Sequence, residues 1–257
     1  MQRKNVDKQW DVFAEISPYF GVVIWDQFKP ENLTDETIAE FFQTGEKYIE
    51  QIEGLIKQHL DAGFQPRRCL DFGCGVGRLV VPLARRHAHV VGVDISQGMR
   101  AEAARNCEKF GLTNVEFIES DDVLSKVSGT FDFIHSYIVL QHIPTSRGES
   151  LLRRMTELLA DDGVAALHFT YAKNESLGKR FKYWMHTSVP FAHNFINLAK
   201  GRKFNYPYTQ INQYDVNKLL EIVQQSGCEH SYLRFTNHDG LLGVILMFQK
   251  KKVGLIY

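Results

Sequence analysis

The stretch Arg68-Cys-Leu-Asp-Phe-Gly-Cys-Gly-Val-Gly-Arg-Leu79 decides the fold, because it has the pattern of a short strand, a glycine turn and the start of a helix. The residues up to Phe72 are typical of a buried strand, and apolar residues at helical spacing predict a helix from Val76 to Arg86. Glycines allow positive φ and let a ligand lie against bare main chain. Since a helix start also offers unpaired N–H groups, the turn predicts a seat for an anionic group.

An acid ahead of the glycines separates two kinds of ligand. The glycines are Gly73, Gly75 and Gly77, and Asp71 precedes the first of them inside the turn. Dinucleotide enzymes place a Gly-x-Gly-x-x-Gly turn in the same setting, with an acid about 20 residues further on. A carboxylate at position 71 would repel a pyrophosphate, whereas it would suit the ammonium of methionine attached to adenosine. The turn favours that zwitterion and leaves a dinucleotide oxidoreductase open.

The segment resembles the first motif of class I S-adenosylmethionine-dependent methyltransferases. Asp71 and the three glycines stand at matching positions, and Cys74 is a small residue inside the turn. The resemblance covers roughly residues 66 to 250 and implies S-adenosyl-L-methionine as the cofactor. It also implies an α/β fold, a Rossmann-like sheet of seven mostly parallel strands with helices on both faces. The implied strand order is 3-2-1-4-5-7-6, with the last strand antiparallel.

A second acid ends the next predicted strand. The run from His89 to Ile95 is apolar and contains Asp94, which lies seventeen residues past Gly77. An acid at the carboxyl end of that strand can accept two hydrogen bonds from ribose hydroxyls. By resemblance to the family's second motif, Ile95 and Met99 would lie against the adenine ring. Simple packing of its own helix is an equal alternative for Met99.

Two more acids follow the third predicted strand, which runs from Asn114 to Ser120. Resemblance implies that an acid here accepts a hydrogen bond from the adenine amino group, while a neighbouring main-chain N–H binds a ring nitrogen. We therefore expect Asp121, in preference to Asp122, and Val123 to lie at the adenine. Without that resemblance, a pair of acids after a strand would indicate only a solvated loop.

The run from Phe131 to Pro144 predicts a fourth strand that continues into a loop. It resembles the fourth motif of small-molecule methyltransferases, in which Ser136 and Tyr137 would border the sulfonium. His142 ends the run, and a histidine with its usual pKa near ~6.5 suits a general base. We expect His142 to contact the acceptor and take its proton, although a structural role is commoner for any one histidine.

Composition and missing motifs exclude several classes. The 257 residues include 30 Lys plus Arg and 30 Asp plus Glu, so no net charge favours nucleic acid or an anionic membrane. The fourth motif has neither the Asn/Asp-Pro-Pro-Tyr segment of enzymes acting on DNA bases nor a Pro-Cys nucleophile. His135 stands where metal-dependent catechol enzymes place a carboxylate, and the four cysteines are scattered, so we expect no metal. Without a signal peptide or membrane-spanning run, the sequence predicts a cytoplasmic location.

The chain divides into an arm and a main domain. Residues 1–63 predict an N-terminal helical arm, in which Tyr19 could either pack in the core or cover the substrate as part of a lid. Residues 64–257 form the predicted methyltransferase domain, interrupted by an extra basic and aromatic segment at 172–210 that contains Trp184. That segment would wall the acceptor pocket, form a solvated face or make a homodimer contact, and residue patterns alone do not separate these roles.

Together these features predict a methyltransferase with a small-molecule acceptor, methylated on oxygen or nitrogen. Two alternatives remain open at this stage. One is a peptide or protein acceptor, and the other is a protein that binds S-adenosylmethionine without transferring its methyl group.

Overall fold

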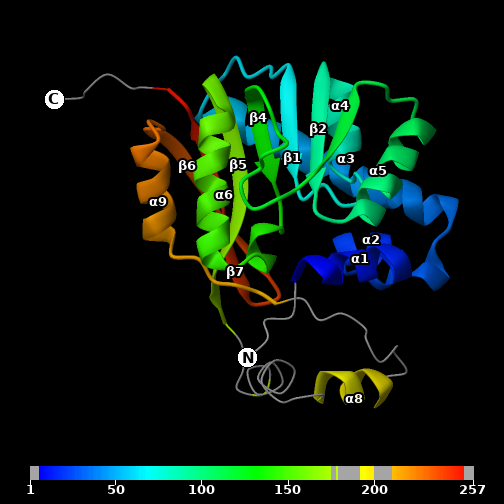
Figure 1. Ribbon diagram of the computed structural model, residues 1–257. Helices are drawn as coiled ribbons and strands as arrows, with labels where there is room; N and C mark the ends of the chain where they lie inside the picture. The colour runs from blue at the N-terminus through cyan, green and yellow to red at the C-terminus, as the bar shows by residue number, and fades with distance from the viewer. Residues whose placement is uncertain (1–5, 175–177, 179–191, 200–209, 252–257) are drawn as a thin grey trace.

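The computed structural model describes residues 6–174, 178, 192–199 and 210–251. In this part of the chain the strands form one seven-stranded sheet in the order β3-β2-β1-β4-β5-β7-β6 (Figure 1). The strands are β1 (Arg68–Phe72), β2 (His89–Asp94), β3 (Val115–Glu119), β4 (Phe131–Ser136), β5 (Leu159–Lys173), β6 (His230–His238) and β7 (Leu241–Gln249). The strand order predicted from the sequence is confirmed, and β7 is antiparallel to both of its neighbours.

Helices cover both faces of this sheet (Figure 1). The α-helices are α1 (Val6–Ile16), α2 (Pro18–Val22), α3 (Asp35–His59), α4 (Val80–Arg86), α5 (Gln97–Lys109), α6 (Thr145–Leu158), α8 (Ala192–Ala199) and α9 (Val216–Gln225). Short 3-10 turns occur at Asp26–Phe28, Pro30–Asn32 and Leu140–His142. Buried residues of α3, α4 and α5 pack on one face, and those of α6 and α9 pack on the other.

The parallel pairing of β1 with β2 and β4 explains where a ligand can bind. Leu70 of β1 pairs with Val91 on one side and with Ile134 on the other, and all three side chains are fully buried. Such central strands need helices on both faces, and their connections return across the sheet, so the carboxyl ends of the parallel strands gather at one edge. The turns after β1, β2 and β4 meet at that edge.

The helix after the glycine turn begins later than the sequence predicts. Helical spacing suggested a start at Val76, whereas α4 begins at Val80. Gly77 has a φ of +85°, which lies outside the right-handed helical region. The chain therefore makes one further turn, up to Leu79, before regular helical hydrogen bonding begins. The main chain of that turn lies next to the glycine turn and extends the candidate site.

The first part of the N-terminal arm, α1 and α2, packs against the edge where those turns gather, whereas α3 covers one face of the sheet (Figure 1). Helix α1 lies close to α5, since a Cβ added at Gly98 would come within 2.7 Å of the Ala14 Cβ. Tyr19 is buried, and its hydroxyl lies 2.8 Å from Glu102 Oε1 and 3.0 Å from Asn106 Oδ1 of α5, so that its one proton is donated to one or shared by both. Tyr19 thus packs in the core of this structure, and contact with a substrate stays a prediction.

Candidate functional site

The glycine turn is tied to the neighbouring strand. Gly73 and Gly75 have φ values of +75° and +52°, which glycine adopts without steric cost. The N–H groups of Gly73 and Cys74 both donate to the Val93 carbonyl of β2, at 2.7 and 3.1 Å. These bonds fix the turn beside the end of β2.

Two valines approach the turn so closely that only glycine fits. A Cβ at Gly73 would lie 2.3 Å from a methyl carbon of Val139, which belongs to the loop after β4. A Cβ at Gly75 would lie 2.7 Å from a methyl carbon of Val22, at the end of α2 in the arm. The main chain of the turn is therefore a bare surface, and in this arrangement the arm and the β4 loop lie against it.

Asp94 sits beside the turn at the end of β2. Its Oδ2 accepts the Gly75 N–H at 2.9 Å, and its Oδ1 accepts the Ser96 N–H at 2.9 Å. Burial raises the pKa of this carboxyl, and the two N–H donors oppose that effect. Each carboxylate oxygen has a second lone pair, so Asp94 is held in place with acceptor capacity left for a ligand.

The residues after Asp94 divide between the core and its boundary. Ser96 caps α5 by accepting the Met99 N–H at 3.4 Å. The Met99 side chain is buried in the core cluster on the α3 face, whereas Ile95 is half-buried. Contact of either side chain with an adenine ring stays a prediction.

Asp71 is buried beneath the turn and bonded to a histidine. It is 2% exposed, and its Oδ1 lies 3.0 Å from Nδ1 of His135 on β4. Because a carboxylate only accepts, Nδ1 carries a proton, and Nε2 lies 3.2 Å from the Tyr48 hydroxyl of α3. The chain Asp71–His135–Tyr48 fixes the carboxylate by one oxygen, and its expected contact with a ligand ammonium stays a prediction.

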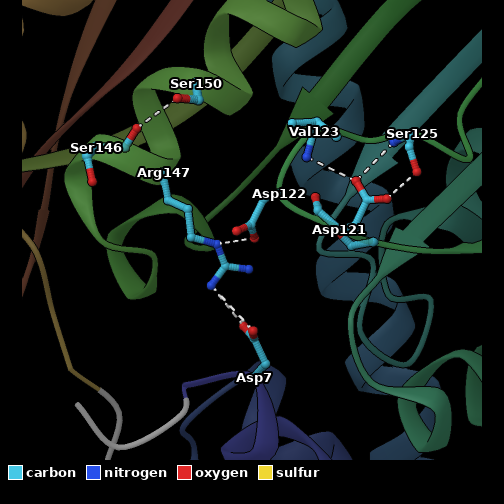
Figure 2. A network of polar contacts seen from close by, with 9 residues as sticks. Asp7, Asp121, Asp122, Val123, Ser125, Ser146, Arg147 and Ser150 are labelled. Carbon is cyan, nitrogen blue, oxygen red and sulfur yellow. Dashed lines mark hydrogen bonds and ion pairs between the residues drawn. The ribbon is translucent and has the colours of Figure 1, made fainter. Parts of the chain in front are cut away.

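The loop after β3 uses Asp121 for its own structure (Figure 2). Asp121 Oδ1 accepts the N–H groups of Val123 and Ser125 at 3.0 and 2.9 Å, and its Oδ2 accepts the Ser125 hydroxyl. These bonds lower the pKa of Asp121. The Val123 N–H, expected at an adenine nitrogen, is thus donated within the loop, and the Val123 side chain is 59% exposed. An adenine contact of Asp121 or Val123 stays a prediction.

Asp122 takes part in a bridge to the arm rather than standing alone. Its Oδ1 lies 2.5 Å from Nε of Arg147 on α6, and Nη1 of Arg147 lies 3.2 Å from Oδ1 of Asp7 on α1. Figure 2 shows Arg147 between the two carboxylates. This bridge, Asp7–Arg147–Asp122, joins three segments that are distant in sequence, and the sequence pattern gave no sign of it.

Aromatic and imidazole rings gather where β4 ends. The Ser136 hydroxyl donates to the Phe72 carbonyl at 2.9 Å, which joins the ends of β4 and β1. The rings of Tyr137 and Tyr48 pack together with their centroids 4.2 Å apart. The Tyr137 hydroxyl lies 3.4 Å from Nε2 of His238 at the end of β6. Tyr48 and His238 could not be predicted from the sequence, because neither belongs to a local motif and only the fold brings them to Tyr137.

His142 is buried, and both of its ring nitrogens have partners. Nδ1 donates to the Gln210 carbonyl at 3.0 Å, and Nε2 lies 3.2 Å from the Gln141 amide nitrogen, from which it accepts. Burial lowers its pKa to about 4. The edge of its ring meets Trp10 of α1, with ring centroids 5.3 Å apart. His142 therefore connects the β4 loop to the arm, and its role as a base stays a prediction that requires exchange of Gln141 for the acceptor.

The acceptor-wall segment, the membrane and the metal remain to be considered among the features discussed from the sequence. Trp184 and most of the segment 172–210 lie outside the described residues. Within the described residues, no helix is long and apolar enough to cross a membrane. In the same part of the chain, no group of three or more His, Cys, Asp or Glu side chains could hold a metal ion.

Comparison with known proteins decides between the two ligand classes. The sequence profile of a family described as "Methyltransferase domain" matches residues 69–163, which contain the glycine turn, Asp94 and the fourth strand. The chain carries a class I S-adenosylmethionine-dependent methyltransferase domain.

Curated relatives of the methyltransferase domain differ in how much of the chain they share. A ubiquinone biosynthesis O-methyltransferase of Coxiella burnetii (strain Dugway 5J108-111) is 28% identical over 193 residues, which cover 73% of this chain and 74% of the relative. A 23S rRNA (uracil(1939)-C(5))-methyltransferase RlmD of Stenotrophomonas maltophilia (strain R551-3) is 38% identical over 105 residues. That match covers 40% of this chain, and the chain spans only 22% of that relative's length.

A solved structure has the fold of the methyltransferase domain over nearly its whole length. Magnesium protoporphyrin IX methyltransferase from Synechocystis PCC 6803, solved with bound SAH, has a TM-score of 0.59 and covers 93% of this chain and 98% of its own. A second solved structure with this fold is a methyltransferase from Methanosarcina mazei. Its TM-score is 0.58, and the match covers 77% of this chain. Their identities of 20% and 18% make these likenesses of fold.

Proposed function

We propose that the domain moves a methyl group from S-adenosyl-L-methionine to an oxygen or nitrogen atom of a small molecule. One observation carries the proposal more than any other. Asp94 is bonded to the main chain of Gly75, so the glycine turn and the acid at the end of β2 form one rigid unit. Bare main chain beside a fixed carboxylate suits a nucleoside whose ribose has both hydroxyls free.

The residues present fit this cofactor. Asp94 would accept the ribose hydroxyls, the turn would face the methionine part, and Asp71 beneath the turn would attract the ammonium. By the resemblance, Ile95 and the loop at Asp121 would lie at the adenine. Cys74 is buried, and burial raises the pKa of its thiol far above the usual value, so it stays protonated and fills space beneath the turn.

The arm has a part in binding. Val22 lies against Gly75, so the arm must move before a cofactor can reach the turn. The bridge from Asp7 through Arg147 to Asp122 can re-form afterwards and close the arm over the site. Closure of this kind excludes water and holds the acceptor in line with the methyl group.

The bound cofactor supplies a methyl group on a positively charged sulfur. The protein's task is then to align the acceptor atom, since charge is dispersed in such a displacement. Tyr137 follows β4, His142 ends the 3-10 turn in the loop after it, and His238 ends β6, so we expect these side chains at the acceptor. Burial lowers the pKa values of both imidazoles, which favours the neutral form with a free lone pair but also makes each a weaker base. A role as base for His142 therefore requires that a bound acceptor raise its pKa again.

A small-molecule acceptor is favoured by the aromatic and imidazole wall around Tyr137, which suits an apolar body with one polar group. The name of the Coxiella relative indicates the same kind of acceptor for that protein. The balance of 30 basic and 30 acidic residues gives nucleic acid no electrostatic advantage.

Two measurements test the proposal. Calorimetry should show binding of S-adenosylhomocysteine and none of NAD; the opposite result would overturn the cofactor assignment. A tritiated-methyl assay should then label the small-molecule fraction of a cell extract. Label in the protein fraction instead would establish a peptide or protein acceptor, and binding without any transfer would establish a protein that only binds the cofactor.

A further inference from the structure

Arg78 follows the last glycine of the turn and is buried. It is 9% exposed, and α3 lies directly against it, because a Cβ added at Gly45 would come within 2.1 Å of the Arg78 carbonyl oxygen. A cation next to a helix start is electrostatically unfavourable, because that end of the helix carries a partial positive charge. Position 78 therefore breaks a local rule, and such breaks mark functional positions.

The guanidinium has little to compensate its charge. Nη1 donates to the Thr44 hydroxyl at 3.3 Å, and the ring centroid of Tyr48 is 5.9 Å from its central carbon. Its Nε is buried without a hydrogen-bond partner. Among the described residues, no carboxylate forms an ion pair with it, and the nearby Asp71 is bonded to His135 instead. A buried cation in this condition is costly unless a ligand completes its bonds.

The surroundings show which end of the site this charge serves. Arg78 lies within electrostatic range of Asp71 on β1. Its guanidinium is beside the Tyr48 ring of α3, and that ring packs on Tyr137 at the end of β4. Asp94, which suits a ribose, lies on the opposite side of the turn, at the end of β2. Arg78 therefore faces the part of the site that would hold the amino-acid end of the cofactor.

Resting on the proposed function, we propose that Arg78 binds the carboxylate of the cofactor's methionine part. Asp71 and Arg78 would then recognise the two charges of one zwitterion, with the acid toward the ammonium and the guanidinium toward the carboxylate. A guanidinium suits this task because its fixed donors match a carboxylate in pairs. Thr44 and Tyr48 are positioning residues that hold the guanidinium from α3.

The test compares two ligands that differ only at this end. S-adenosylhomocysteine carries the amino acid, whereas 5′-methylthioadenosine lacks it and keeps the nucleoside. For Arg78→Gln, calorimetry should show affinity for S-adenosylhomocysteine lower by about 10- to 150-fold, as for loss of a charged hydrogen bond. Affinity for 5′-methylthioadenosine should change by less than about threefold. Arg78→Lys, which keeps the charge, should lose less than Arg78→Gln.

Arg85→Gln is the matched control, since Arg85 lies on α4, the helix that follows the turn, with its side chain 44% exposed and an ion pair to Glu46 at 3.6 Å. It should leave both affinities unchanged. Without ligand, Arg78→Gln should melt at the wild-type temperature or above it, because removing an uncompensated buried charge costs nothing.

The outcomes separate this inference from the proposed function. If wild type binds neither adenosine ligand, the proposed function fails. If wild type binds S-adenosylhomocysteine but Arg78→Gln weakens both ligands equally, or neither, Arg78 does not hold the carboxylate. A variant that melts well below wild type and loses both ligands would show that Arg78 is structural.

Discussion

Gly73→Ala should be far more costly than an ordinary glycine substitution, because the turn there has no room for a side chain. The new Cβ would lie 2.3, 2.4 and 2.9 Å from three carbon atoms of Val139. Real Cβ contacts do not approach that closely, so either the turn or the β4 loop must shift. Gly111, at the end of α5, is the matched control, because it has a similar φ of +67° and nothing within 4 Å of an added Cβ.

The magnitudes follow from separating two costs. A non-glycine residue in the left-handed region costs about 1 to 2 kcal/mol, which both variants bear. Overpacking a filled site adds about 1 to 3 kcal/mol, which only Gly73→Ala bears. Gly111→Ala should thus lower the free energy of unfolding by about 1 to 2 kcal/mol and Gly73→Ala by about 2 to 5 kcal/mol. The corresponding falls in melting temperature are about 2 to 8 °C and about 4 to 20 °C.

Urea unfolding of both variants without ligand measures the difference. The double variant Gly73→Ala/Val139→Ala should recover part of the loss, since the two closest atoms are methyl carbons of Val139. Equal losses for Gly73→Ala and Gly111→Ala would show that the β4 loop yields freely. The account of the turn as a surface against which that loop is packed would then be refuted.

Three further predictions concern the rest of the site. Arg147→Gln breaks two partly exposed ion pairs worth about 0.2 to 1 kcal/mol each. Amide hydrogen exchange in α1 should therefore become about 2- to 30-fold faster, while exchange in α3 is unaffected. Unchanged exchange rates in a mass-spectrometric experiment would contradict the bridge. Asp94→Asn should weaken S-adenosylhomocysteine about 10- to 100-fold in calorimetry, and an unchanged dissociation constant would remove Asp94 from the ribose site. Burial lowers the pKa of His142 to about 4 and that of His168, on β5, to about 3, whereas in the unfolded chain both histidines take up a proton near pH ~6.5. The free energy of unfolding should therefore fall by about 2 to 3 kcal/mol between pH 7.5 and pH 5.5, because only the unfolded chain becomes protonated in that range. Urea midpoints that do not move between these pH values would contradict this prediction.

Much of the fold follows from local sequence. The strand pattern before Phe72, the glycines after it and the acid at the end of the next strand each have a local physical reason, and the strand order inferred by resemblance is confirmed. The start of α4 was missed by four residues, because apolar spacing continues through Gly77 while its positive φ interrupts the helix. Hydrophobic periodicity depends on which side chains are apolar, so it does not detect such a change in main-chain conformation.

The candidate site could be predicted only in part. Its motif residues were found because each lies beside a strand end that the sequence already marks. Arg78 belongs to the motif stretch 68–79, yet nothing in the sequence marks it as a binding residue. Its significance depends on α3, which buries the guanidinium and gives it a single hydroxyl partner. His238 became a candidate only because β6 runs parallel to β5 and brings its end to Tyr137.

The amino-acid sequence by itself determined the strand–turn–helix unit at Gly73 and the acid at Asp94, and so favoured S-adenosylmethionine over a dinucleotide, because these features depend on main-chain conformation and on residues close in the chain. Tertiary structure alone decided which charges are paired and which are left without a partner. Asp71 is hydrogen-bonded to His135, Asp122 is ion-paired with Arg147, and Arg78 forms an ion pair with no carboxylate in the described chain. Pairing and burial depend on contacts between segments far apart in sequence, and no local pattern encodes them.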